Sequence, residues 1–212
     1  MLTGILKWGH INEGTGKFRC KAVPVANYLA LPSSGLTLDW NSSAGDHSSR
    51  VRLRWENEGW TAEIDLVPDR ATAVLRLSAT WAVQQFLLFR DMKDPDLWLA
   101  TDGRGRWGEM HGSERRDLDG CVDIDLIGTP FTNSIAIHRL QLQIGESADV
   151  LIMSIDVKTL AVERMLQRYT RTGASTWRYP SLAAGVAVEV SVDDHGLVID
   201  EPPSFFRSTS VR

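Results

Sequence analysis

Polar and apolar residues alternate along much of the chain, most clearly between residues 51 and 66. VRLRW at 51–55 and WTAEIDL at 60–66 each place apolar side chains at every second position, and ENEG between them is a loop signal. A period of two is that of a β-strand, so this stretch predicts a β-hairpin. Because one face of each strand is apolar and the other polar, the pattern indicates antiparallel sheet.

Other segments repeat this period. We predict a strand at 71–81 and a hairpin that runs from VAVEVSV (186–192) through the turn DDHG to LVID (197–200). Two segments have a weaker helical period, WAVQQFLLFRDM (81–92) and VKTLAVERMLQR (157–168). The prediction is a mainly β fold of antiparallel strands with one or two short helices.

Two aspartates stand in a strand-like pattern within GCVDIDLIGTPFTNSIAIHRLQLQIG, residues 120–145. Alternation places Asp123 and Asp125 on one face, with Cα atoms ~6.6 Å apart. That spacing falls within the range of glycosidase carboxylate pairs, but every D-x-D in a strand has it. Three interpretations stay open: solvated structural carboxylates, the polar rim of a binding cavity, and a catalytic or metal-binding pair.

The second half of this segment also has strand-like spacing. GTPFTN is a turn signal, and Ile135 and Ile137 then continue the alternation. The phase changes at His138 and Arg139, which predicts a β-bulge that directs Arg139 toward the two acids. Direct pairing of Asp125 with Arg139 across the strands is an alternative role for both residues.

Composition narrows the possible functions. The net charge is −4 and no Lys/Arg cluster stands beside an aromatic stripe, so we expect no nucleic-acid partner. The chain has neither a signal-peptide pattern nor an apolar run long enough for a transmembrane helix, which predicts a cytoplasmic protein. Cys20 and Cys121 are predicted to be buried free thiols, since no disulfide or zinc spacing is present. At 212 residues we expect one domain, 1–207, with a disordered tail at 208–212.

Catalytic motifs are absent from the sequence. It contains no G-x-S-x-G, no H-E-x-x-H and no phosphate-binding loop, since DGRGR lacks the G-K-[ST] ending. We therefore predict no catalytic residues, no metal and no cofactor, and favour a binding protein over an enzyme. Nothing in the sequence indicates an oligomeric state.

Four motifs resemble those of a known family in order and spacing. They are DGRGRW (102–107), LDGCVDIDLIGTPFTNSIAIHRLQLQIG (118–145), QRYTR (167–171) and VDDHGLVIDEPPSFFR (192–207). They resemble the "putative glycolipid-binding" family of bacterial proteins, formerly a domain of unknown function. The resemblance covers about 98–207, whereas 1–50 match poorly beyond Trp8, 82–96 are longer than the family's usual connection, and Glu201 replaces a common aromatic.

The resemblance implies a fold and a ligand class. The fold is a single spirally rolled antiparallel β-sheet, a half-barrel similar to lipoprotein carriers, and the partner is a lipid or glycolipid held in its cavity. We expect eight residues near that ligand: Asp123, Asp125, Asn133, Arg139, Gln167, Tyr169, Trp107 and Arg104. Gln167 and Tyr169 share a strand face. Trp107 follows the turn DGRGR and is expected near a rim of the cavity, where the nearby Arg104 would bind an anionic head group.

Three functions remain from these observations. The first is a protein that binds a lipid or glycolipid in the β-roll cavity. The second is a protein-interaction module whose β-roll is filled and whose edges bind another chain. The third is a hydrolase of glycolipid metabolism that uses Asp123 and Asp125, which requires a carboxylate with a raised pKa in the cavity.

Overall fold

The computed structural model describes residues 28–91, 93–181 and 186–208. Within them lie fourteen strands, one α-helix, α1 (Phe131–Leu140), and one 3-10 helix, η1 (Arg116–Leu118). The strands are β1 (Leu36–Ser42), β2 (Ser48–Glu56), β3 (Gly59–Val67), β4 (Ala71–Ser78), β5 (Val83–Phe89), β6 (Leu97–Thr101), β7 (Trp107–Glu109), β8 (Asp123–Leu126), β9 (Ser147–Ile155), β10 (Val162–Arg171), β11 (Thr176–Ser181), β12 (Val186–Val192), β13 (Val198–Glu201) and β14 (Phe205–Arg207).

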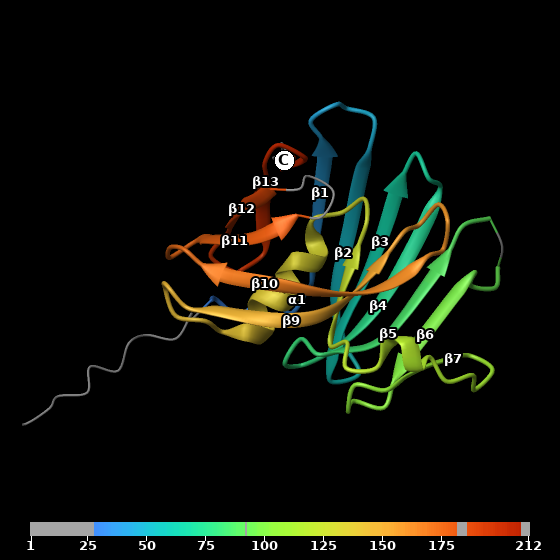
Figure 1. The fold of residues 1–212 in the computed structure, drawn as a ribbon. Coiled ribbons are helices and arrows are strands. Elements are labelled where there is room, and N and C mark those ends of the chain that lie inside the picture. Colours follow the sequence, from blue (N-terminus) through green and yellow to red (C-terminus); the bar gives the residue numbers. More distant parts are fainter. Residues whose placement is uncertain (1–27, 92, 182–185, 209–212) are drawn as a thin grey trace, which may run out of the picture.

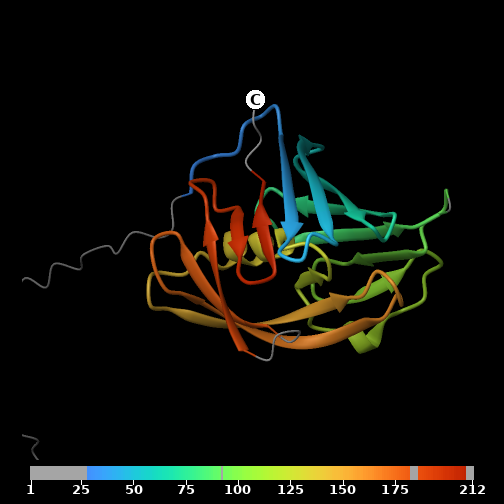
Figure 2. The same ribbon diagram turned by 90° about the horizontal axis from the view of Figure 1, so that it is seen from above.

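All fourteen strands belong to one sheet, in the order β7-β6-β5-β4-β3-β2-β1-β14-β13-β12-β11-β10-β9-β8. Neighbours are antiparallel except β8 and β9, which are parallel. The sheet curves around α1, which lies on its concave side (Figures 1 and 2). The mainly β, rolled antiparallel fold is thereby confirmed, as an open sheet that does not close into a barrel.

The predicted hairpins are confirmed. β2 pairs with β3 so that Trp55 lies opposite Trp60, and β12 pairs with β13. The loop of the first hairpin is shorter than ENEG: only Asn57 and Glu58 connect the strands, both with positive φ, as in a type I′ turn. The strand predicted at 71–81 is β4, which ends at Ser78.

Neither predicted helix exists. Residues 81–92 contain β5, where Val83 and Phe86 are both buried although they stand three apart. A register shift between Arg76 and Leu77 in the pairing with β4 produces this spacing, which imitates a helical period. Residues 157–168 contain the first part of β10, which pairs with β9 without a break from Val162 to Thr170.

The helix lies instead where strand and bulge were predicted. α1 occupies 131–140, and every side chain from Phe131 to Ile137 is buried. This part of the helix has no solvent-exposed face, and its polar residues Thr132, Asn133 and Ser134 are buried, so its sequence has no amphipathic period to reveal it. Pro130 stands directly before the helix, where its fixed φ and missing N–H favour helix initiation.

α1 joins two hydrophobic clusters. Phe131 and Ile135 pack in the first cluster, with the inner faces of β1 to β6 and with Ile124 and Leu126 of β8. Ala136 and Ile137 pack in the second, with β9 to β13. Because Ile124 and Leu126 face the first cluster, alternation directs Asp123 and Asp125 toward the side of the second.

Some predictions fall outside the described residues. These include Cys20 and the predicted tail, except Ser208, whose N–H donates to the Asp39 carbonyl at 2.8 Å. Cys121 is a buried free thiol, and burial raises its pKa to about 11.

Candidate functional site

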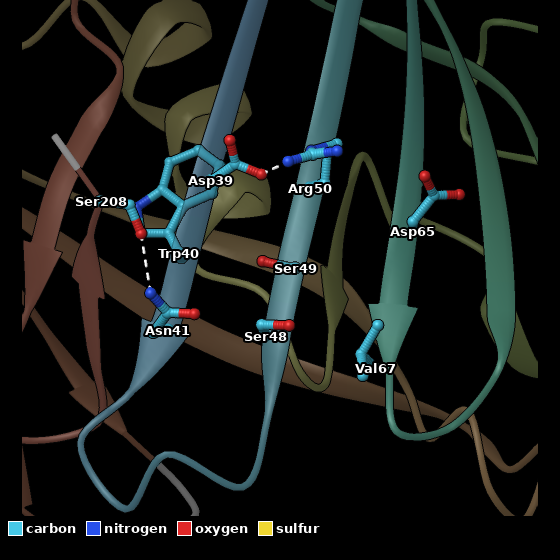
Figure 3. Close-up of a pocket in the computed structure, with 9 residues that line it drawn as sticks. All are labelled: Asp39, Trp40, Asn41, Ser48, Ser49, Arg50, Asp65, Val67 and Ser208. Carbon is cyan, nitrogen blue, oxygen red and sulfur yellow. Dashed lines mark hydrogen bonds and ion pairs between the residues drawn. The ribbon is translucent and has the colours of Figure 1, made fainter. Parts of the chain in front are cut away.

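A depression of about 480 Å³ lies on the outer face of β1, β2 and β3 (Figure 3). Its charges are already paired: Arg50 Nε lies 2.7 Å from Asp39 Oδ1, and Asp65 lies 2.8 Å from Arg52. Half-exposed pairs of this kind are typical of a solvated sheet face. The depression therefore lacks the mostly apolar lining of a ligand pocket.

A cavity of about 330 Å³ that opens to the surface lies at the N-terminal end of α1, among β8 to β11, β13 and β14. Leu126, Ile127, Met165 and Phe205 give it an apolar lining. Ile127 is 53% exposed, so this lining reaches the surface. A volume of about 300 Å³ or more is sufficient for a small-molecule ligand.

Polar side chains line another part of the same cavity. Asp125 and Gln167 come from β8 and β10, and Glu201 comes from β13. Gln167 is only 3% exposed, and its Oε1 atom has no hydrogen-bond partner among the described residues. A buried amide oxygen without a partner costs free energy, so this atom is a natural acceptor for a ligand donor.

Asn133 of α1 holds the polar groups in place. Tyr169 donates its hydroxyl to Asn133 Oδ1 at 2.9 Å, while Asn133 Nδ2 donates to the Tyr179 hydroxyl at 3.1 Å and to Glu201 Oε2 at 3.3 Å. This network connects the helix with β10, β11 and β13. Asn133 and Tyr169 therefore position the residues that line the cavity.

Three carboxyls line the cavity, those of Asp125, Glu201 and the exposed Glu163, and burial acts on the pKa values of Asp125 and Glu201. Burial raises the pKa of Asp125 to about 6. Burial is also the main cause that raises the pKa of Glu201 to about 7; the nearby charge of Asp125 adds to it, and a hydrogen bond with Tyr179 opposes it. Both groups can hold a proton near neutral pH, so each can donate as well as accept a hydrogen bond. No Lys or Arg among the described residues lines this cavity.

Asp123 and Arg139 form a buried ion pair beside the cavity. Arg139 Nε and Nη2 lie 3.0 and 2.6 Å from the two carboxylate oxygens of Asp123, which is 1% exposed. The end of α1, and not the predicted bulge, brings Arg139 to this acid. Arg139 pairs with Asp123 and not with Asp125, and neither member of the pair lines the cavity.

Trp107 and Arg104 lie away from the cavity. Trp107 begins β7, as predicted, but its side chain is buried and donates its indole N–H to the Cys121 carbonyl at 2.9 Å. Arg104 is exposed in a turn that Asp102 closes by accepting the N–H groups of Arg104 and Arg106.

Of the predicted site residues, only Asp125 and Gln167 line the cavity. Sequence reasoning missed the other lining residues, among them Tyr179 and Glu201 of the polar network. Tyr179 and Glu201 come from β11 and β13, and only the roll of the sheet brings them next to Asp125. The replacement of an aromatic residue by Glu201 was the one sequence signal at either position.

The two other predicted functions are not supported. The hydrolase requires Asp123 and Asp125 together, and although Asp125 has a raised pKa in the cavity, Asp123 is paired with Arg139 outside it. The interaction module requires a filled roll, and the cavity shows that the roll is not completely filled.

Within 28–91, 93–181 and 186–208, no three His, Cys, Asp or Glu side chains form a group suited to a metal ion. No helix in these ranges has the length and apolar character needed to cross a membrane.

Comparison with known proteins gives the family. No curated protein matches the chain. A crystal structure of a DUF1089 family protein from Pseudomonas aeruginosa is similar, with a TM-score of 0.60 and 27% sequence identity over 94% of this chain and 100% of that one. The sequence profile of the family described as "putative glycolipid-binding" matches residues 37–207. The chain therefore belongs to the "putative glycolipid-binding" family.

Proposed function

We propose that the protein binds an amphipathic ligand in the cavity at the N-terminal end of α1, with an apolar chain against Ile127, Met165 and Phe205. The unpartnered Oε1 atom of Gln167, buried in a cavity with an apolar part and a polar part, is the observation that carries this proposal. Each methylene that enters such a lining contributes about 0.8 kcal/mol. The name of the family, which refers to glycolipids, agrees with this class of ligand.

The charge of the cavity indicates the kind of head group. Asp125 and Glu201 line it without a basic partner there, so a carboxylate or phosphate head would be repelled when they are ionised. Hydroxyl groups can donate to Gln167 Oε1 and can either donate to or accept from the two carboxyls. The ligand is therefore a neutral, hydroxyl-rich lipid such as a glycolipid, and not a lipid with the anionic head group expected from Arg104.

A matched pair of probes tests this proposal. Calorimetric titration with monomeric n-octyl β-D-glucopyranoside should show binding, while octanoate, with a similar chain and an anionic head, should bind at least about tenfold more weakly, a difference of about 1.4 kcal/mol. Equal or tighter binding of octanoate would overturn the neutral head group. Absence of octyl glucoside binding, together with a lipid-free mass by native mass spectrometry, would overturn the site.

Two neighbouring residues of β10 provide the variant and its control. Gln167→Leu removes the unpartnered oxygen at nearly constant size, so it should weaken octyl glucoside binding while leaving the free energy of unfolding unchanged or slightly higher. Leu166 lies on the opposite face of the strand and is 65% exposed, so Leu166→Ala should leave binding unchanged. A loss of binding that is equal in both variants would contradict the role of Gln167.

A further inference from the structure

A second pocket, of about 430 Å³, lies at the C-terminal end of α1. α1 has ten residues and so is about 15 Å long, which separates this pocket from the cavity at its other end. We call it the aromatic pocket; its lining consists of Tyr28, Leu29, Ala30, Leu31, Trp55, Trp60, Ala79, Trp81, His138 and Gln141.

Two tight turns and the helix end bring the aromatic rings together. The turn at Asn57 and Glu58 places Trp55 opposite Trp60, with ring centroids 5.0 Å apart in an edge-on contact. The turn between β4 and β5 presents Trp81, whose φ of +66° is rare for a bulky residue and costs free energy. The ring of Trp81 stacks flat on His138, 3.9 Å away. Backbone strain of this kind is concentrated at ligand sites.

The indole N–H groups of these tryptophans differ from those of Trp40, Trp107 and Trp177. Trp40, Trp107 and Trp177 each donate to a protein oxygen at 2.9 to 3.1 Å. Trp55, Trp60 and Trp81 donate to no group within the described parts of the chain. Trp55 is 44% exposed, and the indole nitrogens of Trp60 and Trp81 are not among the buried polar atoms that lack a partner. Three indole donors therefore remain open to acceptors in the pocket.

The remaining polar groups of the aromatic pocket are uncharged. Among the described residues, its lining contains no Asp, Glu, Lys or Arg. Burial lowers the pKa of His138 to about 4, so the imidazole is neutral at physiological pH, and Gln141 offers an exposed amide. The aromatic pocket thus combines flat apolar faces with neutral hydrogen-bonding groups and provides no countercharge for an ionic ligand.

We propose that the aromatic pocket is a binding site for a neutral pyranose ring, separate from the cavity proposed above and independent of it. The C–H face of a pyranose packs on an indole ring, while its hydroxyl oxygens accept from the open indole N–H groups and its hydroxyl protons are donated to Gln141. Trp55, which is 44% exposed, provides the accessible ring face.

Indole N–H resonances provide a direct readout. The eight tryptophans give eight such resonances in a ¹⁵N–¹H correlation spectrum, which single Trp→Phe variants assign. Titration with methyl β-D-glucopyranoside, methyl β-D-galactopyranoside and methyl α-D-mannopyranoside should shift the resonances of Trp55, Trp60 and Trp81 with at least one sugar. Those of Trp40, Trp107 and Trp177 should not move.

A pair of variants with similar exposure tests the contact. Trp55→Ala should weaken sugar binding about tenfold, because it removes the exposed stacking surface and one donor. Phe206→Ala is the control, since Phe206 is 43% exposed and lies in β14, outside the aromatic pocket. Thermal unfolding of both variants checks that Trp55→Ala remains folded.

Three outcomes would overturn the pyranose site. The first is the absence of shifts with all three sugars. The second is a shift of the same three resonances by tetramethylammonium alone, which would indicate a cation cage. The third is a response to octyl glucoside but to no methyl glycoside, which would mean that the alkyl chain is the bound part. Gln167→Leu should leave the response to methyl glycosides unchanged, so failure of this site and failure of the cavity can be distinguished.

Discussion

Asp123 and Arg139 place a buried charge pair next to the proposed cavity. The carboxylate is almost fully buried and the guanidinium makes bidentate contact with it. In such a pair each charge is tolerated only because the other is present. The role of Arg139 is therefore to neutralise Asp123, and this role belongs to stability and not to ligand selection.

Arg139→Ala should lower the free energy of unfolding by about 3 kcal/mol, because it leaves the Asp123 carboxylate buried without a partner. Octyl glucoside binding at a temperature where the variant is folded should change little. Urea denaturation measures the first quantity and calorimetry the second.

The double variant Asp123→Asn/Arg139→Met is the control for this prediction. It removes both charges, so its loss of stability should be smaller than the sum of the losses of Asp123→Asn and Arg139→Met, each measured alone. Additive losses would contradict the assignment of a coupled pair.

At the scale of the element, the turn between β2 and β3 has a residue in an unfavourable conformation. Glu58 has a φ of +57° in a type I′ turn, where glycine is preferred. Glu58→Gly should therefore raise the free energy of unfolding by about 0.5 kcal/mol, since relief of the strained conformation exceeds the gain in freedom of the unfolded chain. Thermal unfolding measures this change.

Asp194→Gly is the comparison for the turn. Asp194 is exposed in the turn between β12 and β13, and it is not among the described residues with positive φ. Glycine should lower stability there, because it only adds freedom to the unfolded chain. A gain at both positions would show that the effect does not come from φ.

The sequence was informative for strands and uninformative for the helix. One face of each of the strands β2, β3 and β12 points toward solvent, so polar and apolar residues alternate in their sequences. α1 is buried along its first seven residues, and β5 contains a register shift, so neither segment has the period expected of its own structure. A periodic pattern arises only where one face of an element is buried and the other is exposed to solvent. An element that is buried on all sides therefore cannot be predicted from periodicity.

The candidate site shows the same division. Asp125 and Gln167 were predicted from alternation in single strands, and both line the cavity. Tyr179 and Glu201 contribute from β11 and β13, and only the curvature of the whole sheet brings these strands to β8. Arg104 and Trp107 were expected near a rim, but the loop that carries them extends along a different part of the roll.

At the scale of the whole molecule, the raised pKa values of Asp125 and Glu201 predict how stability depends on pH. Their unfolded values are 3.8 and 4.5, and their folded values are about 6 and 7. Between about pH 4 and 7 the folded state therefore binds more protons at these groups than the unfolded state. The contribution of these two carboxyls to the free energy of unfolding is fully present near pH 4. It is lost as the pH rises through their folded pKa values, by at most about 3 kcal/mol for each group.

Comparison with the double variant Asp125→Asn/Glu201→Gln isolates this contribution. His138, with its lowered pKa, acts in the opposite direction over the same range, but it is present in both proteins and cancels in the difference. Urea denaturation from pH 4 to 7 should show that the variant gains stability relative to the wild type as the pH rises. A difference that does not depend on pH would contradict the prediction.

The order of the strands has a kinetic consequence. Every neighbouring pair in the sheet joins strands that follow one another in the chain, except β1 and β14. The sheet thus consists of two halves, β1–β7 and β8–β14, the second of which begins with the parallel pair β8 and β9. Within the described residues, the strand pairing between the halves comprises three residue pairs, Trp40 with Arg207, Asn41 with Phe206 and Ser42 with Phe205. Each half can form from contacts that are close in sequence, whereas their union requires closure of a loop that contains most of the chain. We expect this joining of the two halves to be the slow event of folding.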